Sequence, residues 1–362
     1  MNVDECVAAV EKFGLTNRQA HFLLTVMRHS GVCVPRQYAA FVGTKYGHKV
    51  TKFFERLTRR TLATECGCLH NRAALYHVRH HALYRAIGQP DSRYRRPVSA
   101  GHAVDRLIRL DAVISHPELH WLGSEDEKVA FFGLLAPSCP SEGLPHTGSP
   151  AADSWRVRLF PDDLPIGITS TGMVIFFIAL PLSDGDFRAV LQRHAALLQA
   201  LPGWTVRLLF RRDGAARSAH FEKMTREELT QQSSPRILAE FTWFCQERKA
   251  TTNSRERSNT DRRFARARRA FGTARYELLY RRWLTDGDGV FRLVSSPVIS
   301  SAIERGTGRI ESQILPFSYR HLAPLVTASS SSEGVEEGEQ GPARPQPQSA
   351  EPDPRDESVL NA

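Results

Sequence analysis

The stretch KYGHKVTKFFERLTRR, residues 45–60, decides which fold we expect for the first part of this 362-residue chain. At about 100° per residue along an α-helix, four apolar residues share one arc and five cations share another, about 120° further round. The apolar residues are Val50, Phe53, Phe54 and Leu57, and the cations are Lys49, Lys52, Arg56, Arg59 and Arg60. One face of this predicted helix therefore packs against the protein and the other meets anions, although a solvated amphipathic helix has the same pattern.

The sequence before this basic helix predicts two further helices. Thr16 and Gln19 form a capping-box pattern, which predicts a helix over residues 17–30 that ends at a glycine. Residues 32–34 are a short β-prone piece, and a proline then favours the start of a second helix over residues 35–42. Helix, short strand, helix, tight turn and helix is the order of a helix-turn-helix core.

Two predicted strands, residues 61–65 and 73–78, follow the basic helix and form a hairpin where a wing belongs. In a winged helix the third helix enters the major groove and the wing touches the neighbouring backbone. We therefore predict a double-stranded DNA interface, with a winged helix that docks on a protein as the alternative. The predicted DNA-binding residues are Lys45, Lys49, Lys52, Arg56, Arg59, Arg60 and, on the wing, Arg72.

The net charge supports a polyanionic partner. The chain has a formal charge of +9, and its last stretch from Ser329 holds eight acidic residues against two arginines, so the rest of the chain is near +15. Nucleic acid is favoured over a membrane surface, because the charges sit among helices without a large insertion face. With no apolar run of about eighteen residues and an acidic N-terminus, we expect a cytoplasmic protein. Six scattered cysteines are expected to be reduced.

We expect no metal and no cofactor. Cys66, Cys68 and His70 are of the types that bind zinc, but the C-x-C spacing is unusual for a structural zinc site. The chain has no glycine-rich phosphate loop.

The middle of the chain predicts an α/β layer. A helix is expected over residues 103–114, and strands over 155–160 and 172–180. A helix over 186–201 and a strand over 204–210 follow. This order packs a helix against a sheet.

The same order resembles the restriction-endonuclease-like nuclease core. In that core an aspartate after one strand and a D/E-x-K triplet on the next strand bind a metal ion and position water. Pro161, Asp162 and Asp163 match the first element, but the strand over 172–180 carries no acid and no lysine where the triplet belongs. The resemblance therefore implies a degenerate core, and a divergent metal-dependent nuclease that uses Asp162 or Asp163 is the alternative.

A winged helix followed by this core resembles the replication-relaxation proteins of plasmids and other mobile elements. The resemblance covers residues 15–212. It implies a noncatalytic, DNA-associated role in the replication, relaxation or transfer of a bacterial mobile element, or in their regulation.

The rest of the chain predicts a basic helical region and a disordered tail. Helices are expected from Met224 and from Pro235, a strand over 290–296 and a short helix over 298–305. Residues 248–282 interleave arginines with aromatic residues, which indicates a second nucleic-acid surface, a solvated spacer or a protein-binding arm. The Ser-, Gly-, Glu- and Pro-rich tail cannot bury enough surface to fold. Its negative charge is expected to compete with DNA for the basic surfaces of the protein.

These observations predict an α+β protein of four parts. The parts are a winged helix-turn-helix domain over residues 1–98, a degenerate nuclease-like α/β domain over 99–215, a basic helical region over 216–327 and a disordered acidic tail over 328–362. A protein partner and a homodimer both stay open.

Overall fold

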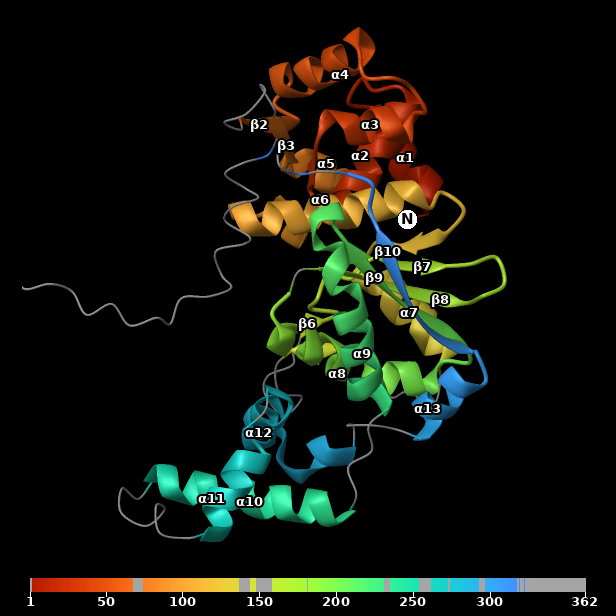
Figure 1. The fold of residues 1–362 in the computed structure, drawn as a ribbon. Helices are drawn as coiled ribbons and strands as arrows, with labels where there is room; N and C mark the ends of the chain where they lie inside the picture. Colours follow the sequence, from red (N-terminus) through yellow and green to blue (C-terminus); the bar gives the residue numbers. More distant parts are fainter. Residues whose placement is uncertain are drawn as a thin grey trace, which may run out of the picture.

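The molecule consists of a helical head, a central sheet and a helical end, arranged one after another along its length (Figure 1). The computed structural model describes residues 2–67, 74–136, 144–147, 158–180, 182–230, 235–253, 262–272, 274–292, 297–317, 319 and 322. The fold is mixed α+β, as predicted. None of the helices in these ranges combines the length and the hydropathy that a membrane span requires.

The head contains the helices and the hairpin that the sequence predicts. Its elements are α1 (Val3–Glu11), α2 (Asn17–His29), β1 (Val32–Cys33), α3 (Pro35–Phe41), α4 (His48–Arg59), β2 (Ala63–Gly67), β3 (Ala74–Val78) and α5 (His81–Ala86). The amide of Thr16 donates to Gln19 Oε1 at 3.1 Å, so the predicted cap of α2 is confirmed. Gly31 ends α2 with φ +73°, and a Cβ there would lie 2.4 Å from the carbonyl oxygen of Tyr94.

A three-stranded antiparallel sheet in the order β1-β3-β2 closes the head on one side. Its core is aromatic: Tyr38 stacks on Phe53 with ring centroids 4.1 Å apart, and Phe54 lies 4.3 Å from Tyr76. Phe22 packs edge-on against both Tyr38 and Phe53. These rings fix α4 against α2, α3 and β3, and a buried aromatic pair stabilises by about 1 kcal/mol beyond its area.

The central sheet has five strands in the order β10-β9-β8-β7-β4. The strands are β4 (His120–Leu122), β7 (Ile166–Ile168), β8 (Val174–Ala179), β9 (Trp204–Phe210) and β10 (Gly308–Ile314). β8, β9 and β10 are parallel, while β7 is antiparallel to both β8 and β4. Every residue of β8 is buried, which explains its continuous apolar sequence: helices cover both of its faces.

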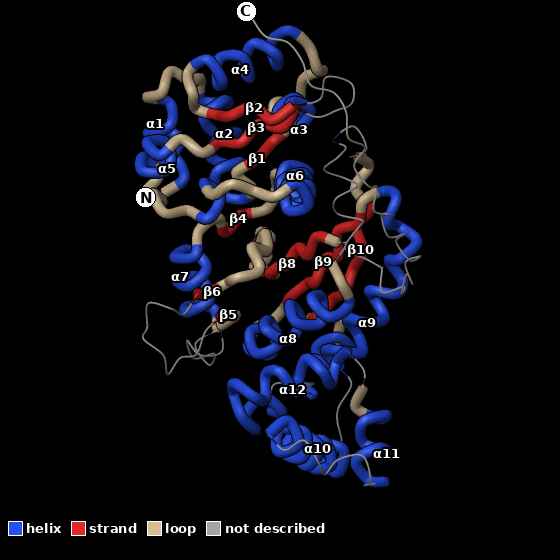
Figure 2. Tube along the Cα trace, turned by 90° about the vertical axis from the view of Figure 1, so that its left-hand side faces the viewer, coloured by secondary structure: helices blue, strands red, loops and turns tan. Residues whose placement is uncertain are grey.

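Helix α6 (Ala100–Ser115) covers one face of the sheet, and the helices of the other face follow β8 in the chain (Figures 1 and 2). Leu107 and Ile108 of α6 pack with Phe177 of β8. Phe176, the neighbour of Phe177, packs with Phe187 of α8 on the opposite face. The helices of that second face are α8 (Asp184–Ala200), α9 (Ser218–Thr230) and α13 (Pro297–Glu304), while α7 (Glu125–Leu135) follows the edge strand β4.

Several predictions for this region are wrong. Residues 158–159 of the strand predicted over 155–160 form β6 (Arg158–Leu159), which pairs with β5 (His146–Thr147) and not with the central sheet. The helix predicted from Met224 begins at Ser218, and residues 290–292 of the strand predicted over 290–296 belong to a 3-10 helix, η5 (Gly287–Arg292). The remaining residues of both predicted strands, 155–157 and 293–296, lie outside the described ranges, as does the tail predicted to be disordered.

A buried ion pair fixes the head to the central sheet. Arg36 of α3 donates from both guanidinium nitrogens to the Asp111 carboxylate of α6, at 2.7 and 2.6 Å. The Tyr319 hydroxyl donates to the same carboxylate at 2.6 Å, and Asp111 is only 2% exposed. Gln37 adds a bond from its side-chain amide to the carbonyl of Leu107, so α3 and α6 are held at two adjacent positions.

The helical end has its own small core. α10 (Pro235–Asn253), α11 (Arg262–Ala270), α12 (Ala274–Asp286) and η5 pack around Phe241, Phe244 and Phe271. The arginine-rich stretch over residues 248–282 is therefore divided among three helices, and α12 joins this unit to α8.

Candidate nucleic-acid interface

Helix α4 lies at the end of the head (Figure 1), and its residues divide into a buried face and an exposed face. Val50, Phe53, Phe54 and Leu57 are each at most 1% exposed, which confirms the packing face predicted from the sequence. Gly43, with φ +68°, follows α3 and makes the turn that brings the chain to α4. The opposite face of α4 is open to solvent.

Four of the predicted DNA-binding residues lie on or beside this open face. Lys45, Lys49, Lys52 and Arg59 are exposed, and no ion pair or hydrogen bond within the described part of the chain involves their side chains. A row of cations without protein partners is free to neutralise phosphates, and each phosphate contact releases condensed counterions. The geometry of these four side chains therefore suits a nucleic-acid backbone.

Two other predicted residues have partners inside the head. Arg56 is half-buried and donates from Nη2 to Gln19 Oε1 of α2 at 2.6 Å. Arg60 donates from Nη1 to the backbone carbonyl of Phe13 at 2.8 Å. The two guanidinium groups therefore fasten the end of α4 to α2 and to the turn between α1 and α2, a role that helical periodicity cannot predict because the partners lie 37 and 47 residues away.

The open face of α4 also presents two residues that the sequence analysis did not select. Glu55 is exposed and lies on the same face as Lys52 and Arg59, one helical turn from each. Tyr46, in the turn before α4, is 65% exposed. A carboxylate among cations reduces nonspecific attraction to phosphate, but it can accept a hydrogen bond from the amino group of cytosine in the major groove.

The wing lies only partly within the described residues. Arg72, Cys68 and His70 are outside them. On the described strands, Cys66 is exposed, and Arg79 donates from Nε to the Thr64 hydroxyl at 3.0 Å across the hairpin. Among the described residues, no group of three His, Cys, Asp or Glu side chains has a geometry that fits a metal ion.

The carboxylates of the nuclease alternative are both paired with arginine. Asp162 accepts from Nε of Arg193 at 3.0 Å and forms an ion pair with Nη2 of the same guanidinium. Asp163 forms an ion pair with Arg93 and lies 3.9 Å from Arg109. A catalytic divalent ion requires carboxylate oxygens that are available as ligands, and these carboxylates are already neutralised by cations.

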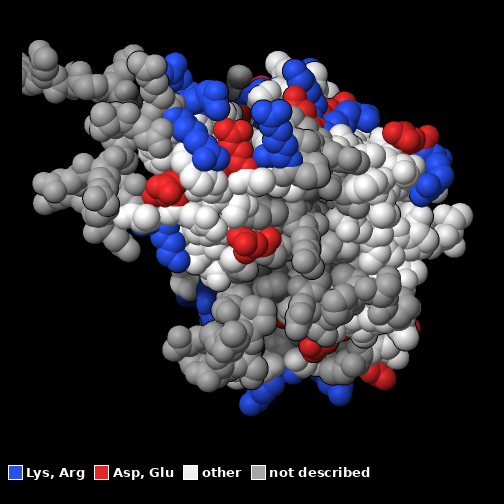
Figure 3. Space-filling view, turned by 90° about the horizontal axis from the view of Figure 1, so that it is seen from below, with Lys and Arg blue, Asp and Glu red and all other residues white. Residues whose placement is uncertain are grey.

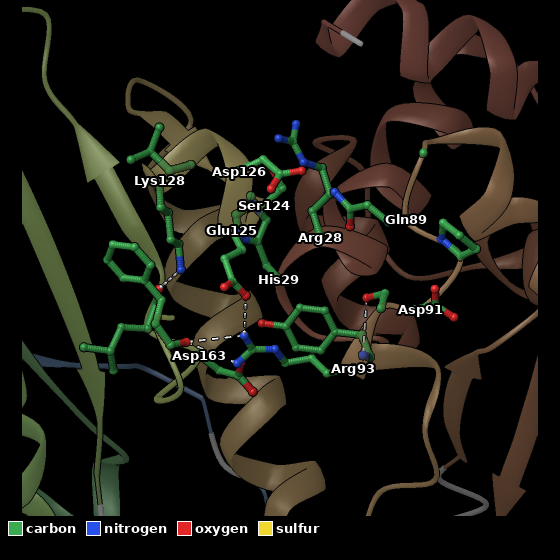
Figure 4. Close-up of a pocket in the computed structure, with 18 of the residues that line it drawn as sticks. Arg28, His29, Gln89, Asp91, Arg93, Ser124, Glu125, Asp126, Lys128 and Asp163 are labelled. Atoms are coloured by element: carbon green, nitrogen blue, oxygen red, sulfur yellow. Dashed lines mark hydrogen bonds and ion pairs between the residues drawn. The ribbon is translucent and has the colours of Figure 1, made fainter. Parts of the chain in front are cut away.

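Asp163 also lines a polar pocket of about 470 Å³ that lies between the head and the central sheet. Figure 4 shows Arg93 between the carboxylates of Glu125 and Asp163, with Lys128 on the far wall. Lys128 Nζ donates to the carbonyl of Leu164 at 2.9 Å. Burial, together with Arg93 and Arg109, lowers the pKa of Lys128 to about 7. Ser124 caps α7, but nothing in the local sequence pattern marks Lys128 as buried.

A second basic surface lies on α11. Arg263, Arg266, Arg268 and Arg269 are all exposed, while Ala267 is 2% exposed and faces the core of the helical end. The Arg263 guanidinium lies 3.7 Å above the Trp243 ring, and Arg266 is 3.9 Å from the Glu240 carboxylate. Figure 3 looks at the molecule from this end: many Lys and Arg side chains lie toward one edge with acidic side chains between them, and others lie at the sides and the opposite edge.

Comparisons of the chain with protein-family models, with curated proteins and with solved structures find no match. The geometry of these sites is therefore the basis for the function.

Proposed function

We propose that this protein is a noncatalytic DNA-binding protein whose head is a winged helix and whose α4 enters the major groove of double-stranded DNA. The observation that carries the proposal is the open face of α4, where Lys49, Lys52 and Arg59 are exposed and have no partner in the described part of the chain. The opposite face of α4 is completely buried. A helix that is fixed on one side and cationic on the other suits insertion into a groove lined by phosphates.

The order of elements in the head supports a winged helix. α2, α3 and α4 correspond to the three helices of the fold, β1 pairs with the hairpin, and β2 and β3 extend from the end of α4. The hydrogen bonds of Arg56 and Arg60 hold α4 against α2 and the turn that precedes α2. A rigid recognition helix loses little conformational entropy when it binds.

The central part supports the resemblance to a degenerate nuclease core. Helix α6, the antiparallel strands β4, β7 and β8, helix α8 and the parallel strand β9 occur in this order in the chain, with α7, β5 and β6 between β4 and β7. β8 has no acid or lysine, and Asp162 and Asp163 are paired with arginines. We propose that this core positions the DNA-binding head, and that the protein acts in the replication, relaxation or transfer of a bacterial mobile element, or in their regulation.

Charge reversal on α4 tests the DNA-binding proposal. The Lys49→Glu, Lys52→Glu variant should bind duplex DNA at least about tenfold more weakly near 0.1 M salt, because it neutralises two fewer phosphates. Fluorescence anisotropy with a labelled duplex measures this affinity. A matched control is Lys223→Glu, Arg226→Glu on α9, which changes the net charge equally at two exposed residues away from the head.

Three outcomes distinguish the alternatives. Equal weakening by the α4 variant and the α9 control would reduce the effect to net charge and contradict the proposal. Unchanged DNA affinity in the α4 variant would favour a winged helix that binds a protein. Cleavage of duplex DNA with Mg²⁺ or Mn²⁺ that Asp162→Ala abolishes would establish the nuclease alternative.

A further inference from the structure

The two basic surfaces lie at opposite ends of the molecule. Figures 1 and 2 show the structure from two directions that differ by a turn about the vertical axis, and in both α4 is at one end and α11 at the other. The two surfaces are therefore separated along the length of the molecule and not only in projection.

The packing between the two surfaces explains this separation. α4 packs on α3, α3 on α6, and α6 on β8 of the central sheet. On the other face of the sheet, α8 contacts α12, whose unit contains α10 and α11. At roughly 8–10 Å for each packed layer, these layers separate α4 from α11 by on the order of 50 Å.

A single short duplex cannot follow both surfaces. The buried face of α4 points toward the core of the head, so a duplex on its open face lies beyond that end of the molecule. To reach α11, the duplex would have to turn around the side of the protein. Smoothly bending 20–30 base pairs by 40–90° costs about 1–6 kcal/mol, and a turn this tight costs more.

The chemistry of α11 suits a phosphate backbone. Arg268 and Arg269 are exposed in its last turn, and no described residue forms an ion pair or hydrogen bond with their side chains. Arg263, whose guanidinium lies over the Trp243 ring, is another exposed arginine of the same helix. Guanidinium groups match phosphate oxygens in pairs, and a phosphate contact carries no sequence information.

We propose that one copy of this protein holds two duplex DNA segments at once. Helix α4 enters the major groove of one duplex, and α11 contacts the phosphate backbone of the other. The proposal rests on the proposed function, because it takes α4 as the first DNA site. It assigns α11 the sequence-independent site, so the second segment can be any duplex.

The stoichiometry of short duplexes on the full chain tests this proposal. A duplex of about 10 base pairs is roughly 34 Å long at 3.4 Å per base pair, shorter than the separation of the two surfaces. Sedimentation velocity at low salt, with protein and labelled DNA followed at separate absorbance wavelengths, gives the number of duplexes bound per protein chain. We expect two duplexes per chain for the wild type, one for Arg268→Glu, Arg269→Glu, and one for Lys49→Glu, Lys52→Glu.

The control is again Lys223→Glu, Arg226→Glu, which should keep two duplexes per chain. Circular dichroism verifies that the α11 variant is folded, so that the loss of a bound duplex is not a loss of folding. The milder Arg268→Gln, Arg269→Gln variant should also bind one duplex per chain. One duplex per wild-type chain, or two in the α11 variants, would overturn the proposal.

The failures of the two proposals are distinguishable. If the α4 variant binds DNA as the wild type does, the first DNA site is not on α4 and the proposed function fails. If the α4 variant loses one duplex while the α11 variants match the wild type, only the second site fails. Two chains bridging two duplexes through their α4 helices would appear as a complex of doubled protein mass with one duplex per chain.

Discussion

Arg59 and Arg60 are adjacent in the sequence, but their side chains have different tasks. Arg60 holds the backbone carbonyl of Phe13, whereas Arg59 is exposed with no partner in the described part of the chain. We predict that Arg60→Ala lowers the free energy of unfolding by about 0.5–1.5 kcal/mol, the usual net worth of a hydrogen bond. Arg59→Ala should leave stability unchanged. It should reduce by about one the number of phosphates neutralised, as read from the salt dependence of DNA binding.

Urea denaturation and binding isotherms on both variants separate the two roles. The pair is its own control, because each variant removes one arginine from the end of α4. If Arg59→Ala destabilised the head as much as Arg60→Ala did, the assignment of partners would be wrong.

Glu55 gives a prediction about specificity. Its carboxylate lies on the open face of α4 among cations, so it repels phosphate while it is able to accept a bond from cytosine. We predict that Glu55→Gln tightens binding to random duplex DNA and lowers the preference for the best sequence. Selection of bound duplexes from a random library, carried out with both proteins, measures this preference. A sharper preference in the variant would argue against contact with bases.

At the residue scale, the sequence predicted which side chains of α4 are buried, because helical periodicity depends only on local spacing. It did not predict the partners of Arg56 and Arg60, because these bonds depend on how α1 and α2 cross α4. Burial of Lys128 was equally hidden, since its environment comes from the segment around Leu164.

At the element scale, the sequence did not predict the strands that have no recognisable sequence pattern and are defined only by their hydrogen bonds to a neighbouring strand. β10, with sequence GRIESQI, lies at the sheet edge, mixes polar and apolar residues and pairs on one side with β9. β4 and β7 have three residues each, too few for a period-two pattern. β8 and β9 were predicted because their apolar runs are long, which is typical of strands buried on both faces.

The misplaced start of α9 has a specific cause. A threonine followed by acidic residues is typical of a helix start, but Glu228 is buried and accepts from Arg188 and from Gln192 of α8, at 2.5 and 2.7 Å. Thr225 donates to the carbonyl of Phe221, a bond of a helix interior. The acid therefore bridges two helices and does not complement a helix end.

This bridge predicts a difference between neighbouring glutamates. Glu228→Ala should lower the free energy of unfolding by roughly 3 kcal/mol, because it leaves the largely buried Arg188 guanidinium without the carboxylate that lies 2.5 Å away. The matched control is Glu227→Ala, because the Glu227 side chain is 44% exposed and its carboxylate is 3.8 Å from Arg188. This substitution should lower the free energy of unfolding by less than about 1 kcal/mol. Chemical denaturation measures both, and equal losses would show that the bridge has no special role.

At the scale of the whole molecule, buried histidines predict sensitivity to acid. Burial, reinforced by Arg28 and Lys128, lowers the pKa of His29 from 6.5 to about 3. Burial also lowers the pKa of His77 and His194. The unfolded chain therefore binds more protons below pH 6.5, and stability that is complete above pH 6.5 is lost as the pH falls toward 3.

We predict that the free energy of unfolding decreases between pH 6.5 and 4, by up to about 1.4 kcal/mol per pH unit for each buried histidine. His29→Gln should make this decrease shallower, because one proton-binding difference is removed. Urea denaturation across this range measures the slope. A slope in the His29→Gln variant equal to that of the wild type would contradict the assignment of His29.

The central claim, that α4 binds duplex DNA through its exposed cations, is tested most directly by the salt dependence of binding. The logarithm of the binding constant should fall linearly with the logarithm of salt concentration, with a slope near −0.9 for each phosphate neutralised. For Lys49→Glu, Lys52→Glu we predict a slope shallower by about 1.8, since two phosphate contacts are lost. An unchanged slope in this variant would contradict the claim and remove α4 from the DNA interface.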